Sequence, residues 1–227
     1  IVSSNVLHDS FRGLEKIEEL EAIAEPNDNQ VRQFILRSRA ILGKLVDGKV
    51  EPYSLEEKLE MLFEAIRLTS PYFDIDHIDK GLYCIDEVKV INQIANIYSK
   101  QGKREQALQI FVQLIEYIKQ HFHNVKQSGG LLPLVSFNYA RELDLDGQYE
   151  KAIEIAKLGW ESCVQYGQYA TLPSSIEIIA ECYHFLGDDE KSKDYYKQAY
   201  YIYKAIGDNH GLNSIKTEIA KYFGSDF

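Results

Sequence analysis

Three short stretches of the chain repeat one pattern around a glycine, and this repetition limits the fold more than any other feature of the sequence. The stretches are "YSKQGKREQALQIF", "DLDGQYEKAIEIA" and "HFLGDDEKSKDYY", and their glycines are Gly102, Gly147 and Gly187. Alanine stands seven positions before each glycine, a large residue four before, and a small residue five after. These positions are Ala95, Ala140 and Ala180, then Tyr98, Leu143 and Tyr183, then Ala107, Ala152 and Ser192. Small residues on both sides of a glycine turn let two antiparallel helices approach closely, so each stretch predicts a helical hairpin.

The pattern resembles the tetratricopeptide repeat, which has small residues, an aromatic residue, a turn glycine and an alanine in this order. The period differs, because the glycines are 147 − 102 = 45 and 187 − 147 = 40 residues apart, against about 34 in the standard repeat. Longer second helices and loops such as "NVKQSGGLLP" at 124–133 account for the difference. We therefore predict an all-α fold, a right-handed superhelix of degenerate repeat hairpins.

Apolar spacing extends the predicted stack at both ends. Stripes over 31–42 and 55–66 predict an earlier hairpin across the connection "GKLVDGKVEPYS". Another stripe predicts a helix over 10–24, capped by Asp9 or Ser10 and ended before Pro26. After "GDNHG", Leu212 and two isoleucines predict a final helix that stops at Gly224 and covers the last repeat.

Charge and cysteine content exclude several classes of protein. The formal net charge is −10, so non-specific binding to nucleic acid is not expected, because phosphate contacts need a concentrated cationic surface. The three cysteines show no C-x-x-C spacing, which indicates neither a disulfide framework nor a zinc module and suits the reducing cytoplasm. No apolar run approaches the roughly 20 residues that a membrane helix needs, so no membrane partner is expected.

Each candidate for chemistry has a simpler structural explanation. His121 and His123 are two positions apart, which points them to different helix faces. "DIDHIDKG" at 74–81 looks like a calcium loop, but Ile78 and Asp79 replace a ligand and the turn glycine. "SGG" at 128–130 is too short to cradle a phosphate. We therefore expect no catalytic site, no metal and no cofactor.

Aromatic residues in the last third of the chain are interpreted as packing residues. The tyrosine run comprises Tyr195, Tyr196, Tyr200, Tyr201 and Tyr203, and the single tryptophan is Trp160. A second helix of a repeat places such a run at core and inter-repeat positions, where one or two hydroxyls could reach water.

What remains for function is the outward side of the first helix of each hairpin, which lines the inside of a superhelix. The predicted lining residues are Asn92, Asn96 and Ser99; Phe137, Asn138 and Arg141; and Glu177, Glu181 and His184. Amides, one cation, two carboxylates and an aromatic ring can hydrogen-bond an extended peptide backbone and still accommodate apolar side chains. A solvated polar face without function is the alternative.

The order "EVKVINQIANIYSKQGKREQALQIF", "LVSFNYARELDLDGQYEKAIEIAKLGWESCVQYG" and "AECYHFLGDDEKSKDYYKQAYYIYKAIGDN" resembles the C-terminal regulatory domain of Gram-positive transcription regulators of the Rgg/MutR and PlcR type. The resemblance covers most of residues 27–222. It implies a domain that dimerises and receives a short signalling peptide, and a DNA-binding helix-turn-helix domain before Ile1. Residues 1–26 would connect the two domains, and residues 27–227 would form the repeat domain.

The same resemblance implies roles for individual residues. In such families, asparagines of the first helices commonly hold the peptide backbone, a role that would fall to Asn92, Asn96 and Asn138. The third repeat has Glu177 and Glu181 at the corresponding places, which would favour a ligand with a free amine or a basic residue.

Three functional hypotheses follow. The first is the ligand-sensing and dimerisation domain of a cytoplasmic transcription regulator, a homodimer that contacts DNA only through a separate N-terminal domain. The second is a stand-alone repeat scaffold that binds a protein such as a response regulator. The third is an enzyme, which the absence of a converging nucleophile, base and orienting group disfavours.

Overall fold

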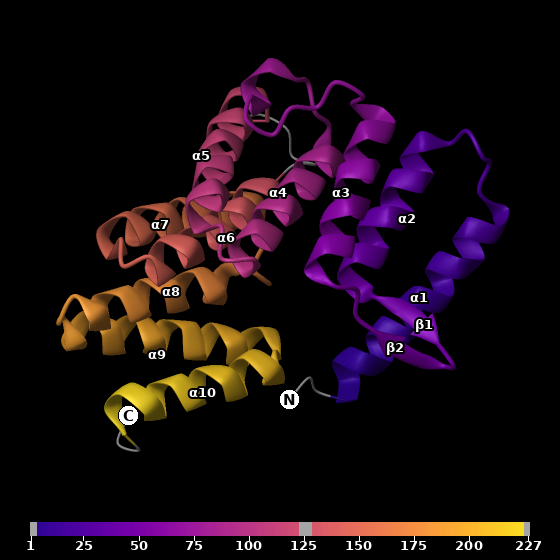
Figure 1. The fold of residues 1–227 in the computed structure, drawn as a ribbon. Coiled ribbons are helices and arrows are strands. Elements are labelled where there is room, and N and C mark those ends of the chain that lie inside the picture. Colours follow the sequence, from indigo (N-terminus) through magenta and orange to yellow (C-terminus); the bar gives the residue numbers. More distant parts are fainter. Residues whose placement is uncertain (1–3, 123–128, 225–227) are drawn as a thin grey trace. The chain divides into compact units, whose positions relative to one another are not determined.

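The computed structural model of the protein describes residues 4–122 and 129–224 and contains ten α-helices in that part of the chain (Figure 1). The chain divides into two compact units, Ile1–Ile110 and Phe111–Phe227, with the boundary inside α5. None of the described helices is long and apolar enough to cross a membrane.

The first unit contains the helices α1 (Ser4–Ile23), α2 (Asn29–Leu42), α3 (Leu55–Thr69) and α4 (Ile85–Lys100), each packed on the next, and the start of α5 (Arg104–His121). A 3₁₀ turn, η1 (Ile78–Lys80), precedes α4. The end of α1 before Pro26 is confirmed, but the predicted caps are wrong, because the helix begins at Ser4 and includes Asp9 and Ser10. No Gly or Pro lies between Ser4 and Ser10 to stop the helix there.

The connection between α2 and α3 contains a β-hairpin that was not predicted. Strands β1 (Lys44–Val46) and β2 (Lys49–Glu51) pair antiparallel, with Leu45 opposite Val50. Asp47 and Gly48 between them have φ of 49° and 72°, as a type I′ turn requires. The Asp-Gly pair between two alternating segments was the available signal for this hairpin.

The second unit contains α6 (Leu131–Leu145), α7 (Tyr149–Tyr166), α8 (Leu172–Phe185), α9 (Asp189–Ile206) and α10 (Asn209–Phe223). Each of these helices packs on the next, so α6–α7 and α8–α9 are the predicted hairpins and α10 covers α9. The final helix ends at Gly224, as predicted.

The three glycine turns share one backbone conformation. Gly102, Gly147 and Gly187 have φ of 80°, 76° and 80°, in the left-handed region that favours glycine. In each turn the N–H of the next residue donates to the carbonyl of the large residue four positions before the glycine, at 2.9 Å. This hydrogen bond satisfies one of the free carbonyls at the helix end. The small residues before and after each glycine are fully buried, and the buried hydroxyl of Ser192 donates to the Ala180 carbonyl at 2.7 Å.

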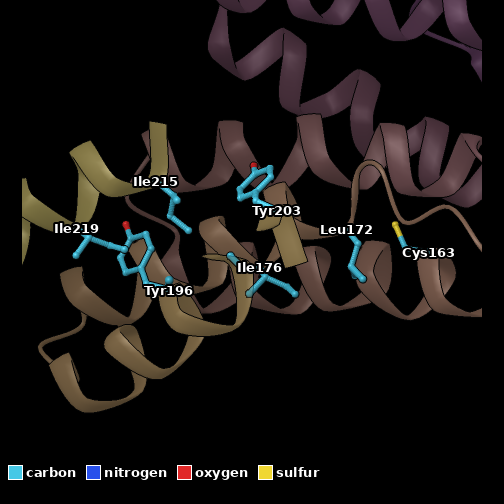
Figure 2. Close-up of a cluster of buried hydrophobic side chains, with 9 residues drawn as sticks. Cys163, Leu172, Ile176, Tyr196, Tyr203, Ile215 and Ile219 are labelled. Carbon is cyan, nitrogen blue, oxygen red and sulfur yellow. The ribbon is translucent and has the colours of Figure 1, made fainter. Parts of the chain in front are cut away.

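The core of the second unit is partly aromatic (Figure 2). Tyr196 is fully buried and Tyr203 is 4% exposed, while Trp160 and Tyr195 pack against them with their rings edge to face. The predicted packing role is therefore confirmed for these residues. It is wrong for Tyr201, which is 64% exposed.

A polar network joins three helices of the first unit. Gln33 of α2 donates to Thr69 of α3 at 2.6 Å, and the hydroxyls of Thr69 and Ser70 donate to Glu87 Oε1 of α4, both at 2.6 Å. Glu87 Oε2 accepts from the Cys84 N–H at 2.7 Å. Because Glu87 is only 5% exposed, its carboxylate depends on these three donors.

We expect Glu87→Gln to lower the free energy of unfolding by about 1–2 kcal/mol, since an amide N–H₂ would face one of the donors that the carboxylate now satisfies. Urea unfolding followed by circular dichroism measures this change. Glu51→Gln, at an exposed position of β2, is the matched control. Equal stability of the two variants would contradict the structural role of the network.

Candidate functional site

The predicted groove residues of the first unit lie along α4. Asn96 and Ser99 are half-buried, whereas Asn92 is only 3% exposed, so it does not face outward as expected. A ligand contact by Asn92 would need its side chain to become exposed. Asn96 lines a hollow with residues of α2 and α3 and is the best-placed member of this group.

In the second unit the structure brings the predicted residues of α6 and α8 together through an ion pair. Arg141 Nη1 lies 2.6 Å from Glu181 Oε2 and 3.0 Å from Asp144 Oδ2. The side chain of Arg141 is 41% exposed, while those of Glu181 and Asp144 are 12% and 3% exposed. The guanidinium therefore covers two carboxylates that are almost removed from water.

Glu177 lies one turn before Glu181 on α8 and is held by the core. The Tyr203 hydroxyl donates to Glu177 Oε2 at 2.9 Å, and Ser174 Oγ lies 3.2 Å from the same hydroxyl. Glu177 Oε1 is buried and has no hydrogen-bond partner among the described residues. One oxygen of this carboxyl group is thus available to a donor.

The C-terminal helix closes one side of the site. The Tyr222 hydroxyl donates to Glu181 Oε1 at 2.9 Å, and its ring lies 4.3 Å from the His184 imidazole. His184 Nδ1 lies 2.7 Å from Asp189 Oδ1. His184 of α8 therefore packs against an aromatic ring of α10.

The remaining predicted residues, Phe137 and Asn138, are half-buried on α6. They precede Arg141 by four and three positions, so they share its helix face. This places an aromatic ring and an amide one turn from the ion pair.

We call Asp144, Glu177, Glu181 and Glu218 the carboxylate cluster; Arg141 is the cation among them. Burial, together with the charges of Glu218 and Glu181, raises the pKa of Glu177 to about 7 against the opposing effect of the Tyr203 hydrogen bond. Burial and the Glu181 charge raise the pKa of Asp144 to about 6 despite the nearby Arg141. Burial and Glu181 also raise the pKa of Glu218. The four carboxyl groups therefore outnumber the two cations that act on them, Arg141 and Lys221.

Four members of this site were not predicted from the sequence: Asp144, Tyr203, Glu218 and Tyr222. Asp144 follows Arg141 by three positions, a spacing that could have indicated the pair. The other three come from α9 and α10, and nothing in their local sequence indicates that they meet α8.

Covalent and metal chemistry find little support in the described part of the chain. Burial raises the pKa of the Cys182 thiol, which keeps it protonated and a poor nucleophile. The described residues hold no group of three or more His, Cys, Asp or Glu side chains that could bind a metal. In the loop that looks like a calcium site, His77 Nδ1 lies 2.8 Å from Asp74 Oδ2. His123 and Ser128 lie outside the described residues.

Comparison with protein families gives one match that spans nearly the whole chain. The family model of the RNPP family C-terminal domain matches residues 8–218. Curated protein sequences give no match.

Solved structures with a similar fold include two states of one regulator. PlcR of Bacillus thuringiensis in its apo form has a TM-score of 0.72 at 17% identity, over 93% of this chain and 72% of that chain. PlcR in complex with the peptide PapR7 and DNA has a TM-score of 0.73 at 17% identity, over 92% and 69%.

Two other proteins share the fold. Aspartyl phosphate phosphatase F of Bacillus subtilis has a TM-score of 0.69 at 13% identity, over 92% of this chain, which spans about half (49%) of that protein. A putative kinesin light chain of Podosopora anserina with TPR-like repeats has a TM-score of 0.53 at 12% identity, over 88% of each chain. These similarities confirm the predicted all-α, TPR-like fold class. Since the RNPP C-terminal domain is a regulatory domain that binds peptides, the chain is not an enzyme.

Proposed function

The chain belongs to the RNPP family as a C-terminal domain of that family, and we propose that it is the ligand-sensing and dimerisation domain of a transcription regulator. Its ligand in this proposal is a short signalling peptide. The observation that carries the proposal is the family match over residues 8–218. The fold shared with PlcR, whose structure with PapR7 and DNA is known, supports it.

The proposed peptide contacts lie on the first helices of the hairpins, in each unit separately. In the second unit they are Arg141, Glu177 and Glu181 of α6 and α8, with Phe137 and Asn138 beside Arg141. In the first unit they are Asn96 and Ser99 of α4. Side-chain amides of this kind can donate to and accept from an extended peptide backbone, and the ring offers an apolar contact.

The carboxylate cluster indicates which charge the proposed ligand carries. Glu177 and Glu218 have raised pKa values because burial and neighbouring carboxylates disfavour their ionised forms. A cation beside them would stabilise the ionised forms. We therefore propose a peptide that presents a free amine or a basic side chain to α8.

We propose that peptide binding is transmitted by a shift in the populations of different arrangements of the hairpins. A stack of hairpins can adopt related arrangements, and a peptide that binds one of them better increases its population. In a cytoplasmic homodimer this change would alter the spacing of two DNA-binding domains, each joined to its repeat domain through α1. DNA affinity that does not respond to a bound peptide would contradict this mechanism.

Peptide selection tests the charge preference. The chain is mixed with synthetic heptapeptide pools that differ only in carrying Lys or Gln at one position, and bound peptides are recovered by gel filtration and identified by mass spectrometry. We expect the Lys pool to bind about tenfold more tightly, since a hydrogen bond between charged groups contributes about 1.5–3 kcal/mol.

The variant Glu177→Gln/Glu218→Gln is expected to lose this preference, because Gln keeps the shape of the side chain and cannot take up the negative charge that a bound cation stabilises. Glu154→Gln/Glu161→Gln removes the same charge from exposed positions of α7 and is the matched control. If Glu177→Gln/Glu218→Gln keeps the preference for the Lys pool, the peptide's cation binds at another place on the chain.

A second candidate function is a scaffold that binds a protein partner. It is favoured by an open hollow of about 820 Å³ in the first unit, where Leu59 and Phe63 of α3 lie among Glu56, Glu60 and Glu64. The fold shared with aspartyl phosphate phosphatase F agrees with either candidate. A folded chain that retains no peptide from any pool would favour the scaffold.

A further inference from the structure

A second charged site lies in the first unit, separate from the carboxylate cluster. It is a hollow of about 250 Å³ between the end of α2, the start of α3 and the C-terminal half of α4. We call it the lysine hollow; its lining residues are Ala40, Ile41, Lys58, Leu62, Gln93, Asn96, Ile97 and Lys100. None of these is Asp or Glu.

Two cations, Lys58 and Lys100, line this hollow. Burial lowers the pKa of Lys58, and the positive charge of Lys100 lowers it further. Neither lysine is within ion-pair distance of a carboxylate in the described parts of the chain. Lys58 is half-buried and Lys100 is exposed, and their like charges repel each other, so the site gains stability when an anion binds.

The polar residues of α4 lie on one face toward this hollow. Gln93, Asn96 and Lys100 are separated by three and four positions, which places them in a row along the helix. Gln93 Oε1 is buried and has no hydrogen-bond partner among the described residues, so the amide can still bond to a ligand. The apolar floor includes Leu62 at 1% and Ile97 at 7% exposure.

These features together define the chemistry of the ligand. Lysines recognise an oxyanion as compact cations with several donors, and a neighbouring amide can bond to the adjacent peptide group. We propose that the lysine hollow binds a carboxylate of the signalling peptide, either its C-terminus or an acidic side chain. The proposal rests on the proposed function and deepens it, because it names a chemical group of the ligand that the first unit binds.

The test uses paired pools of N-acetylated heptapeptides with either a free or an amidated C-terminus, selected on the full chain as above. We expect the free-carboxylate pool to bind about 10- to 100-fold more tightly, as a charged hydrogen-bonded pair would give. Enrichment of Asp and Glu among the bound peptides of the amidated pool would show that the hollow binds an acidic side chain of the peptide. Equal binding of both pools without such enrichment would overturn the proposal.

Variants separate this site from general effects of charge. Lys58→Gln/Lys100→Gln is expected to abolish the discrimination, while Lys49→Gln/Lys80→Gln, which removes two exposed lysines of the same unit, leaves it unchanged. Discrimination that persists in the first variant would overturn the proposal.

A titration with acetate tests the hollow independently of the peptide. Two-dimensional NMR of the chain should show saturable shifts of the side-chain amide signals of Gln93 and Asn96, absent in Lys58→Gln/Lys100→Gln. If acetate binds in this way and no peptide pool is retained, the proposed peptide function fails while the carboxylate site stands. Amide signals that do not respond to acetate would count against the hollow.

Discussion

Replacing Glu177 with Gln is expected to stabilise the folded chain at pH 8 by about 3 kcal/mol. The folded-state pKa of Glu177 is raised from 4.5 to about 7, so the folded protein holds a proton that the unfolded chain releases. Stability from this group is complete below pH 4.5 and is lost as the pH rises through about 7. A shift of about 2.5 units corresponds to roughly 3 kcal/mol, and Gln does not ionise.

Urea unfolding between pH 4 and pH 8 measures the effect. The variant should match the original chain near pH 4.5 and exceed it at pH 8, while Glu154→Gln, exposed on α7, follows the original chain throughout. The variant should still lose some stability as the pH rises from about 4 to 6, because burial also raises the pKa of Asp144 from 3.8 to about 6. A variant that is less stable than the original at pH 8 would show that the Glu177 charge is already compensated.

Truncating Tyr196 to Ala is expected to cost about 3–5 kcal/mol, the usual loss for a large buried aromatic side chain. Tyr196 is fully buried among Ile176, Ala199 and Ile219, so its removal leaves a cavity in the core of the second unit (Figure 2). Thermal and urea unfolding both report the loss.

Tyr196→Phe should behave differently, which separates packing from polarity. The Tyr196 hydroxyl is buried without a hydrogen-bond partner among the described residues, so its removal should be neutral or stabilise by up to about 1 kcal/mol. A loss of 2 kcal/mol or more in Tyr196→Phe would mean that the hydroxyl is hydrogen-bonded in the folded protein.

Repetition made the hairpins predictable. The glycine turns at Gly102, Gly147 and Gly187 require a left-handed residue, and small residues at fixed distances allow the helices to meet, so local sequence determines this part of the fold. The β-hairpin at 44–51 and the start of α1 were missed. The available local signals were the Asp-Gly turn inside the predicted connection and the absence of a helix breaker before Ser10.

The candidate site was predictable only where one helix contributes several residues. Arg141 of α6 and Glu177 and Glu181 of α8 follow from helical spacing, and the structure brings Arg141 and Glu181 into contact. Tyr203 and Tyr222 join the site through the packing of α9 and α10, which no local pattern specifies. Asn92 was misplaced because a spacing argument shows which helix face a residue lies on and does not show what covers that face.

Hydrogen–deuterium exchange of the full chain, free and saturated with the most strongly retained synthetic heptapeptide, tests the central proposal most directly. If the chain is a peptide-sensing domain of the proposed kind, exchange should slow in α4, α6 and α8, which carry the proposed peptide contacts. Retention of no peptide by the folded chain, or slowed exchange confined to α3 around Leu59 and Phe63, would contradict the proposal and favour a scaffold for a protein partner.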